Sequence, residues 1–368
     1  MNTESLFELL KVVREPDIQE TLGDLNMISA PTKKLGRYAV DLYCYPAPEH
    51  YFDSVVDELA NIATTADVRL EINQKEMTPG QVGDLEELLL EKTKQADGTS
   101  PINILSIPGS KTRVLGFSSG KGGVGKSSVT LGIASALTVL GHKVGILDAD
   151  VYGFSIPKML GVRRTPSVIG KVLIPPVSHG IRTMSVGYFV SDDTPVIWRG
   201  PMLHKALEQF LVDVYWGDLD YLCIDLPPGT GDVTLSLAEY MPKMETFVVT
   251  TPQDAAERVA QRSALAARKL KLPVRGVIEN MSFFQGDDGK RYEIFGAGGG
   301  EILSKSLEVP LIGSLPIDIA LRHGGDVGEP VVFSASESLV SLELLKIARA
   351  IVKMGPARIY KSELKIRQ

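Results

Sequence analysis

One short stretch combines the residue types that bind phosphate groups. Glycines, two lysines and a serine follow an apolar run at residues 114–117 and precede a second one at residues 129–137, in the order Gly120-Lys121-Gly122-Gly123-Val124-Gly125-Lys126-Ser127. Glycines allow backbone N–H groups to turn toward phosphate oxygens, and the helix that follows adds the partial positive charge of its N-terminus. The pattern Gly-x-x-x-x-Gly-Lys-Ser between a strand and a helix is a P-loop.

The roles within the loop follow from the chemistry of a nucleoside triphosphate. Lys126 is expected to reach the β- and γ-phosphates, and the Ser127 hydroxyl is expected to bind Mg²⁺. We expect the nucleotide-binding set to run from Gly120 through Ser128. Lys121 stands where the general motif accepts any residue, so its spacing alone favours neither a second phosphate contact nor a solvated lysine.

A pair of carboxylates follows the apolar run at residues 144–147. Asp148 and Asp150 come after this run, and in a parallel α/β sheet the ligand lies at the carboxyl ends of the strands. One carboxylate is then placed to hold the Mg²⁺ shell and the other to orient the attacking water. An Asp-rich turn that caps the next helix is the alternative interpretation of the same two residues.

Two more strand ends carry polar groups. Asp225 directly follows the apolar run 221–224, where P-loop enzymes hold Mg²⁺, usually through water, and the N–H of Gly229 is placed to sense a γ-phosphate. Asn280 follows the run 274–278, and its amide carries both the donor and the acceptor that an adenine edge requires. From the sequence alone, a helix cap is an equally good interpretation of Asn280.

The pattern from residue 112 onward is that of repeated strand–helix units. Near-continuous apolar strands with helical crossovers predict an α/β fold, a doubly wound, mainly parallel sheet of the P-loop NTPase type with helices on both faces. We expect strands at 114–118, 144–147, 221–224, 246–250, 274–278 and 311–314, and helices at 128–140, 202–214, 254–270 and 336–352.

The first 96 residues form a separate compositional unit. Helical apolar spacing at residues 5–13 ends at Pro16, and further elements are expected as strands at 36–45 and 68–72 and helices at 49–63 and 83–94. We predict a small α/β domain at 1–96, a linker at 97–111, the P-loop ATPase domain at 112–355 and a basic tail at 356–368.

Length, composition and charge exclude several classes of protein. A chain of 368 residues with 44% hydrophobic and 23% charged residues is ordinary for about two globular domains, which excludes global disorder and a fibrous class. No apolar run reaches the ~18 residues of a membrane span, and no secretion signal is visible at the N-terminus, so we expect a cytoplasmic protein. Residues 1 to 110 carry 9 Lys and Arg against 19 Asp and Glu, which argues against a nucleic-acid surface there.

Six segments together resemble the Mrp/ApbC family of ATPases, in the deviant Walker A group that also holds MinD, ParA and the nitrogenase iron protein. These segments lie within residues 110–335, and residues 13–18 are similar to the small α/β domain often fused ahead of Mrp proteins. The six are Lys-Gly-Gly-Val-Gly-Lys-Ser (121–127), Asp-Ala-Asp-Val-Tyr-Gly (148–153), Trp-Arg-Gly-Pro-Met (198–202), Ile-Asp-Leu-Pro-Pro-Gly-Thr-Gly-Asp (224–232), Thr-Thr-Pro-Gln (250–253) and Glu-Asn-Met-Ser (279–282).

The resemblance implies a homodimer with ATP and Mg²⁺ at the interface, where Lys121 reaches the phosphates of the partner. Asp150 then matches the carboxylate that positions the hydrolytic water, so the expected catalytic set is Lys121, Lys126 and Asp150. The implied metal set is Ser127, Asp148 and Asp225, the two Asp residues acting through water, and the implied base reader is Asn280.

The function implied by the resemblance is ATP-dependent carriage of iron–sulfur clusters, with apoproteins or assembly scaffold proteins as partners. Many Mrp proteins hold the cluster with a Cys-x-x-Cys pair shortly after Asn-Met-Ser, but here Gly286 and Gly289 stand at those positions. Cys44 and Cys223 are the two cysteines of the chain, and Cys223 lies in an apolar run that predicts a buried, inert thiol. We therefore expect intact ATP chemistry without the usual cluster ligands.

A positioning ATPase is the alternative class of function for this sequence. MinD- or ParA-like positioning ATPases bind membrane or DNA, and MinD-like proteins end in an amphipathic membrane helix. The tail at 358–367 is basic but short for an anchor, and a positioning protein has no need of the segment 198–202. We therefore expect neither nucleic-acid binding nor stable membrane association.

Overall fold

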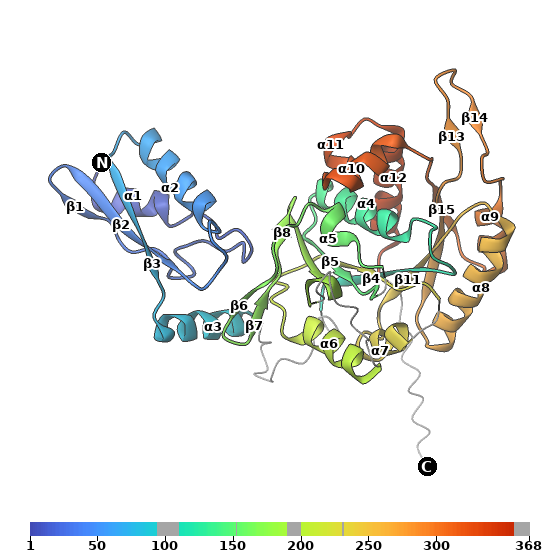
Figure 1. Ribbon diagram of the computed structural model, residues 1–368, viewed down its shortest axis with the longest axis horizontal. Helices are drawn as coiled ribbons and strands as arrows, with labels where there is room; N and C mark the ends of the chain where they lie inside the picture. The colour runs from blue at the N-terminus through green and yellow to red at the C-terminus, as the bar shows by residue number, and fades with distance from the viewer. Residues whose placement is uncertain (94–109, 152, 190–199, 230–231, 357–368) are drawn as a thin grey trace, which may run out of the picture. The chain divides into compact units, whose positions relative to one another are not determined.

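The computed structural model describes residues 1–93, 110–151, 153–189, 200–229 and 232–356 (Figure 1). The chain divides into two compact units. The first contains Met1–Ile102, Arg164–Val177 and Val212–Gly217, and the second contains Asn103–Arg163, Ser178–Leu211 and Asp218–Gln368. Two short segments from later in the chain therefore pack with the N-terminal residues.

A three-stranded sheet forms the centre of the first unit. Strand β2 (Arg37–Cys44) lies between β1 (Thr32–Lys34), which is antiparallel to it, and β3 (Leu70–Glu76), which is parallel. The helices are α1 (Thr3–Leu10), α2 (Asp53–Thr65) and α3 (Pro79–Thr93). The predicted elements are present, but α1 ends at Leu10 because the chain turns there, and the Val13 N–H donates to the Leu10 carbonyl at 3.2 Å.

A hairpin from later in the chain completes the core of the first unit. Strands β6 (Ser167–Ile169) and β7 (Val172–Ile174) are antiparallel, and Ile169, Val172, Ile174 and Tyr215 are buried in one cluster with side chains of α1, α2 and β2. At its base, the Arg164 guanidinium donates to both carboxylate oxygens of the buried Asp17.

An eight-stranded sheet forms the centre of the second unit. The strand order is β15 (Leu311–Ser314), β12 (Val274–Glu279), β11 (Glu245–Thr250), β4 (Arg113–Ser119), β10 (Tyr221–Asp225), β5 (Val144–Asp148), β9 (Ile181–Ser185) and β8 (Val177–Ser178). Every pairing from β15 to β9 is parallel. The predicted fold class, a doubly wound and mainly parallel sheet, is confirmed.

Helices cover both faces of this sheet. In Figure 1, α4 (Lys126–Val139), α5 (Ile156–Met159), α10 (Ile319–Val327), α11 (Val331–Ser334) and α12 (Leu339–Met354) lie above it, and α6 (Gly200–Val212) and α7 (Asp232–Tyr240) lie below. The remaining elements are η1 (Val186–Phe189), α8 (Asp254–Lys269), α9 (Gly299–Ser306) and the antiparallel hairpin β13 (Phe284–Gln285) and β14 (Arg291–Tyr292).

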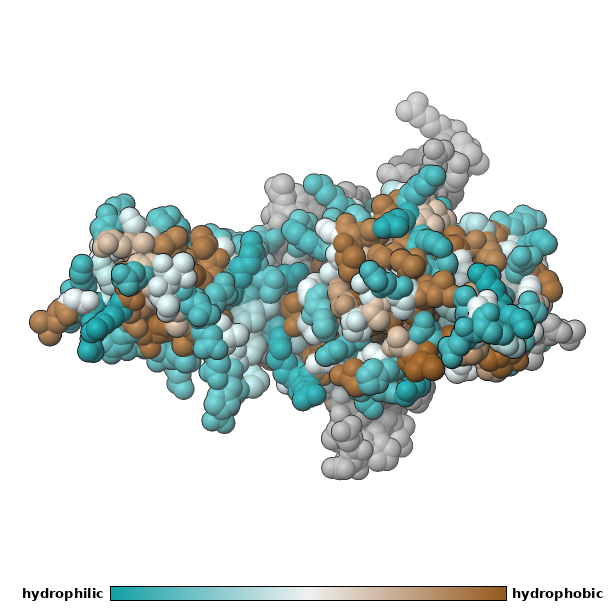
Figure 2. All heavy atoms as spheres, turned by 90° about the horizontal axis from the view of Figure 1, so that it is seen from above, coloured by the Kyte–Doolittle hydropathy of each residue, from teal (hydrophilic) through white to brown (hydrophobic). Residues whose placement is uncertain are grey.

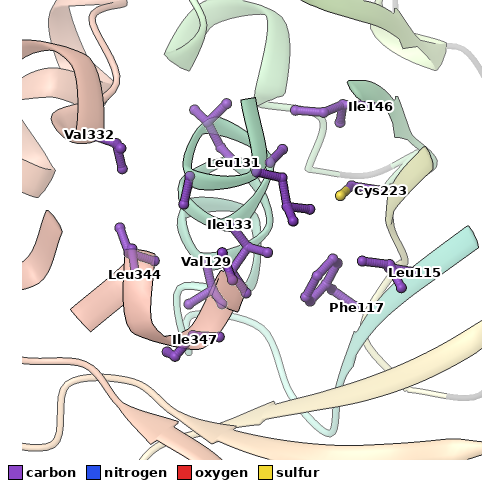
Figure 3. Packing of buried hydrophobic residues seen from close by; sticks show 14 of the residues in the cluster. Leu115, Phe117, Val129, Leu131, Ile133, Ile146, Cys223, Val332, Leu344 and Ile347 are labelled. Carbon is purple, nitrogen blue, oxygen red and sulfur yellow. The ribbon is translucent and has the colours of Figure 1, made fainter. Parts of the chain in front are cut away.

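The core of the second unit is built around α4. Figure 3 shows Val129 and Ile133 of α4 facing side chains of the strands on one side and Leu344 and Ile347 of α12 on the other. The two helices approach closely at Gly132, where a Cβ would lie 2.8 Å from the Leu344 side chain. This packing fixes the start of α4, and with it the P-loop. Cys223 is fully buried in this core, as its apolar surroundings predict.

Candidate nucleotide site

The P-loop connects the end of β4 to the start of α4, as predicted. Gly123 and Gly125 have φ angles of +81° and +78°, a region that favours glycine. A Cβ on Gly125 would lie 2.2 Å from Nδ2 of Asn280, so this position also has no room for a side chain. Around Gly122 and Gly123 no atom lies within 4 Å of the Cβ position, which leaves open space for phosphate groups on that side of the loop.

Lys126 brings together residues from three strand ends. Its side chain is 6% exposed, and Nζ lies 2.7 Å from Oδ1 of Asp225 and 3.4 Å from Oδ2 of Asp150. The order β4-β10-β5 explains this convergence, because the carboxyl ends of neighbouring parallel strands lie at the same edge of the sheet.

Asp225 is an enclosed acid of the site, as Asp148 is. It is fully buried, with Ser127 Oγ donating to Oδ2 at 2.5 Å and Thr130 Oγ1 donating to Oδ1 at 3.0 Å. Burial raises the pKa of the Asp225 carboxyl, and Lys126, Ser127 and Thr130 oppose that rise. Sequence reasoning missed Thr130. The available signal is its spacing of four residues from Lys126, which places both on one face of α4.

Asp148 holds the loop that carries Asp150. Its Oδ1 accepts the N–H of Asp150 at 3.2 Å, and its Oδ2 accepts the N–H groups of Ser155 and Ile156 at 3.0 and 3.1 Å. Asp148 therefore accepts hydrogen bonds from the start of α5, as the helix-cap interpretation of the aspartate pair predicts. Its place in an outer metal shell stays a prediction.

The burial of Asp148 makes the stability of the protein depend on pH. Burial, together with the charge of Asp225, raises the pKa of the Asp148 carboxyl from 3.8 to about 7. Between these values the folded state binds a proton that the unfolded chain has released, so this group's contribution to the free energy of unfolding falls as pH rises. We expect a fall of order 4 kcal/mol between pH 4 and pH 7 and no further change above.

Asp148→Asn should remove this dependence. Chemical denaturation of both proteins from pH 4 to pH 8, without nucleotide, measures the difference between their free energies of unfolding. That difference should change with pH through the acidic range and level off near neutrality. A constant difference over the whole range would contradict the assignment.

Two predicted phosphate contacts are engaged within the chain. Lys121 Nζ donates to Oε1 of Gln253 at 3.2 Å, and the N–H of Gly229 donates to the Ser119 carbonyl at 2.9 Å. Both groups lie at the same sheet edge as the P-loop. The single N–H of Gly229 must leave its present partner to contact phosphate, whereas the ammonium of Lys121 has two further donors.

Asn280 contacts the P-loop and is not the N-cap of any helix in the described part of the chain. Its Nδ2 donates to the Val124 carbonyl at 2.9 Å, its side chain is almost fully buried, and its Oδ1 has no hydrogen-bond partner among the described residues. A buried amide oxygen without a partner costs free energy unless a ligand satisfies it. Asn280 therefore retains the acceptor that base reading requires.

No thiolate pair lies where Mrp proteins have one. Residues 286–289 form the turn of the β13–β14 hairpin, and Gly289 has a φ of +77°, which disfavours any other residue. Burial raises the pKa of the Cys44 thiol to about 11 and that of Cys223 to about 12. Within the described ranges, no group of three or more His, Cys, Asp and Glu side chains is arranged to hold a metal ion.

None of the described helices is both long enough and apolar enough to cross a lipid bilayer.

Comparisons with known proteins give the family. Residues 110–352 match the family described as ParA, the NUBPL iron-transfer P-loop NTPases. An iron-sulfur cluster carrier protein of Mycobacterium leprae is 41% identical over 352 residues, covering 92% of this chain and 90% of that protein. One of Synechocystis sp. is 37% identical over 360 residues, covering 95% and 97%.

Solved structures support the same fold. A nucleotide-binding protein of Archaeoglobus fulgidus in complex with ADP is 34% identical and has a TM-score of 0.51. The match covers 62% of this chain and 94% of that one. MinD of Pyrococcus furiosus has a TM-score of 0.52 over 66% of this chain and 99% of its own, but at 23% identity it shows the fold alone. With its P-loop, its strand-end aspartates and these relatives, the chain belongs to the NUBPL-type iron-transfer P-loop NTPase family.

Proposed function

We propose that the chain is a Mg²⁺-dependent ATPase that acts in the transfer of iron–sulfur clusters to apoproteins. The observation that carries the proposal is the convergence of Lys126, Asp150 and Asp225 on a P-loop, in a chain whose full-length relatives are named iron-sulfur cluster carrier proteins. The ADP-bound relative from A. fulgidus supports a nucleotide at this site.

Each side chain has a role in this proposal. ATP with Mg²⁺ supplies the phosphoryl bond whose hydrolysis drives the cycle. The P-loop N–H groups and Lys126 hold the phosphates, Ser127 and Asp225 hold the metal shell, and Asp150 orients the attacking water. The acceptor Oδ1 of Asn280 reads the base.

We further propose a cytoplasmic homodimer that forms around the nucleotide. Lys121 is half-buried and contacts Gln253 of its own chain at 3.2 Å. In the dimer it leaves this contact and reaches the phosphates of the other protomer. Scaffold proteins and apoproteins are the proposed partners, and they supply the thiolates that residues 286–289 lack.

A cluster-transfer assay tests the function. A scaffold protein loaded with a cluster is mixed anaerobically with an apoprotein whose enzyme activity requires that cluster. The full-length chain with ATP and Mg²⁺ should increase the rate at which activity appears, and neither ADP nor the variant Lys126→Ala should do so. Equal rates with and without nucleotide would refute the proposal.

Asp150→Ala should separate ATP binding from turnover. In this proposal the Asp150 carboxylate lies beside Lys126 but does not bind Mg²⁺ or its water ligands. Its removal should therefore change the affinity for ATP by less than about threefold. Turnover should fall by about 10²-fold or more, the effect of removing a group that orients or deprotonates water. Asp326→Ala, at an exposed carboxylate of α10, is the matched control. Unchanged phosphate release by Asp150→Ala would contradict the assignment.

Anaerobic reconstitution with iron and sulfide tests direct cluster binding. Clusters are held mainly by Cys thiolates, and burial raises the pKa of the Cys44 thiol, which disfavours the thiolate form. We therefore expect well under one cluster per dimer by iron and sulfide analysis, with the same result for Cys44→Ala. A stable cluster that this substitution abolishes would instead identify Cys44 as a ligand.

A further inference from the structure

A groove of about 450 Å³ opens beside the β13–β14 hairpin in the second unit. Its apolar lining includes Phe284, Ile319 and Leu342, and its carboxylates are Asp287, Asp318 and Glu337. We refer to these six residues as the acidic groove. Figure 2 looks down on the side of the molecule where α10 to α12 lie and shows hydrophobic side chains at the surface among hydrophilic ones.

The acidic groove combines exposed apolar surface with carboxylates that form no salt bridge with a described residue. Ile319 is 67% exposed and Leu342 is 45% exposed, although both are large and apolar. None of the three carboxylates forms a salt bridge with a described residue, and no lysine or arginine is among the residues that line the groove. Oδ1 of Asp318 caps α10 through the Ala320 N–H at 2.7 Å, which leaves Asp287 and Glu337 fully available. The matching ligand carries apolar and cationic side chains together.

The chain itself contains such a segment. The predicted basic tail at 356–368 has a single acidic side chain, Glu363, and Leu364 and Ile366 alternate in it with basic residues. Its cations are Arg358, Lys361, Lys365 and Arg367. Residues 357–368 lie outside the described part of the chain.

The start of the tail is placed within reach of the acidic groove. The tail follows α12, whose first turn contributes Leu342 to the groove, and Arg275 donates to the carbonyls of Met354 and Gly355 at the other end of this helix. From Leu342 to Met354 is about 18 Å along the helix axis. The chain from Met354 to Leu364 spans up to about 33 Å when extended. The last residues of the tail can therefore return to the groove of their own chain.

We propose that the acidic groove binds the basic tail of the same chain, with Leu364 and Ile366 on its apolar lining and the tail cations beside Asp287 and Glu337. The groove wall continues into the nucleotide site, because Phe284 follows Asn280 by four residues. In between, the Ser282 N–H donates to the Leu315 carbonyl at 2.9 Å, and the Ile317 N–H donates to the Phe283 carbonyl at 2.7 Å. The bound tail thus covers one side of the β13–β14 hairpin, at the end of the strand that carries Asn280.

Competition with a labelled peptide of residues 357–368 tests the proposal in the full-length protein. The tail variant Lys365→Glu/Arg367→Glu should empty the groove and bind the peptide with a Kd of about 10 µM, measured by fluorescence anisotropy. The wild-type chain should bind it about 100-fold more weakly, because its own tail competes at an effective concentration of about 1 mM. Equal affinity of the two proteins would overturn the proposal.

Variants of the groove identify where the peptide binds. In the tail-variant background, Asp287→Lys/Glu337→Lys should weaken peptide binding at least 10-fold, and Leu342→Ser should weaken it without a change of charge. Glu239→Lys/Glu301→Lys, at two exposed carboxylates of α7 and α9, should leave the Kd within twofold. Unchanged binding by the groove variants would overturn the proposal. The proposal would also be overturned if the wild-type tail competed with the peptide only at protein concentrations where sedimentation shows a dimer. The groove would then bind the tail of a second copy. ATP turnover enters none of these readouts.

Discussion

Lys126→Ala is expected to abolish nucleotide binding and to lower the free energy of unfolding by about 3–5 kcal/mol, the cost of leaving a buried charge without its partner. Lys126 is the cation of a buried site, with Asp225 at 2.7 Å and Asp150 at 3.4 Å. Asp225 is fully buried, and after the substitution only the hydroxyls of Ser127 and Thr130 would stabilise its charge. A lysine that only contacted phosphate would leave the stability of the nucleotide-free protein unchanged.

A second substitution separates these two effects. Lys126→Ala combined with Asp225→Asn removes both buried charges, so it should recover a large part of the lost stability while nucleotide binding stays absent. Urea denaturation without nucleotide and calorimetric titration with ATP measure the two quantities. Lys121→Ala is the control, because its half-buried side chain forms one described hydrogen bond, to Gln253, and its loss should cost less than about 1 kcal/mol. A stable Lys126→Ala protein would contradict the proposed electrostatic role.

The convergence at the nucleotide site could be predicted from sequence because it depends on one rule of topology. Asp148 and Asp225 each end an apolar run, and parallel strands bring such ends to the same edge as the P-loop. The hydrogen bonds of Asp148 could not be predicted, since a short strand end followed by a helix gives the same pattern for a metal shell and for a cap.

Contacts between segments that lie far apart in the chain could not be predicted from the sequence. The Asn280 contact with the Val124 carbonyl requires the end of β12 to approach the P-loop across β11. An apolar run indicates a strand but does not give its position in the sheet. The contact of Lys121 with Gln253 depends in the same way on where α8 begins.

The assignment of residues 164–177 to the first unit had no signal in the sequence. A short hairpin of alternating apolar residues is compatible with any neighbouring core. Ile169 and Ile174 belong to strands that pack against α3, earlier in the chain, and they share one buried cluster with side chains of α1, α2 and β2. Periodicity within the hairpin shows that one face is buried, but it does not show against what.

The isolated fragment 1–102 is therefore expected to lack a cooperative fold. It omits Ile169, Val172, Ile174 and Tyr215, which are at most 5% exposed in the intact protein. Each such side chain contributes about 1.5–3 kcal/mol when fully buried, against a total of about 5–15 kcal/mol for a whole domain. Asp17 would also lose both of its partners from the later segment, Arg164 and the Val177 N–H.

Two measurements test this expectation. Fragment 1–102 should show poorly dispersed amide resonances and a broad thermal transition. The same fragment joined through a glycine–serine linker to residues 164–177 should regain dispersion and a sharper transition, because the hairpin restores three buried side chains and the ion pair to Asp17. In the joined fragment, Arg164→Ala should remove much of this gain, while Lys171→Ala, at an exposed residue of the hairpin turn, should not. A cooperative transition in fragment 1–102 alone would contradict this expectation. It would mean that the core of the first unit forms without the hairpin.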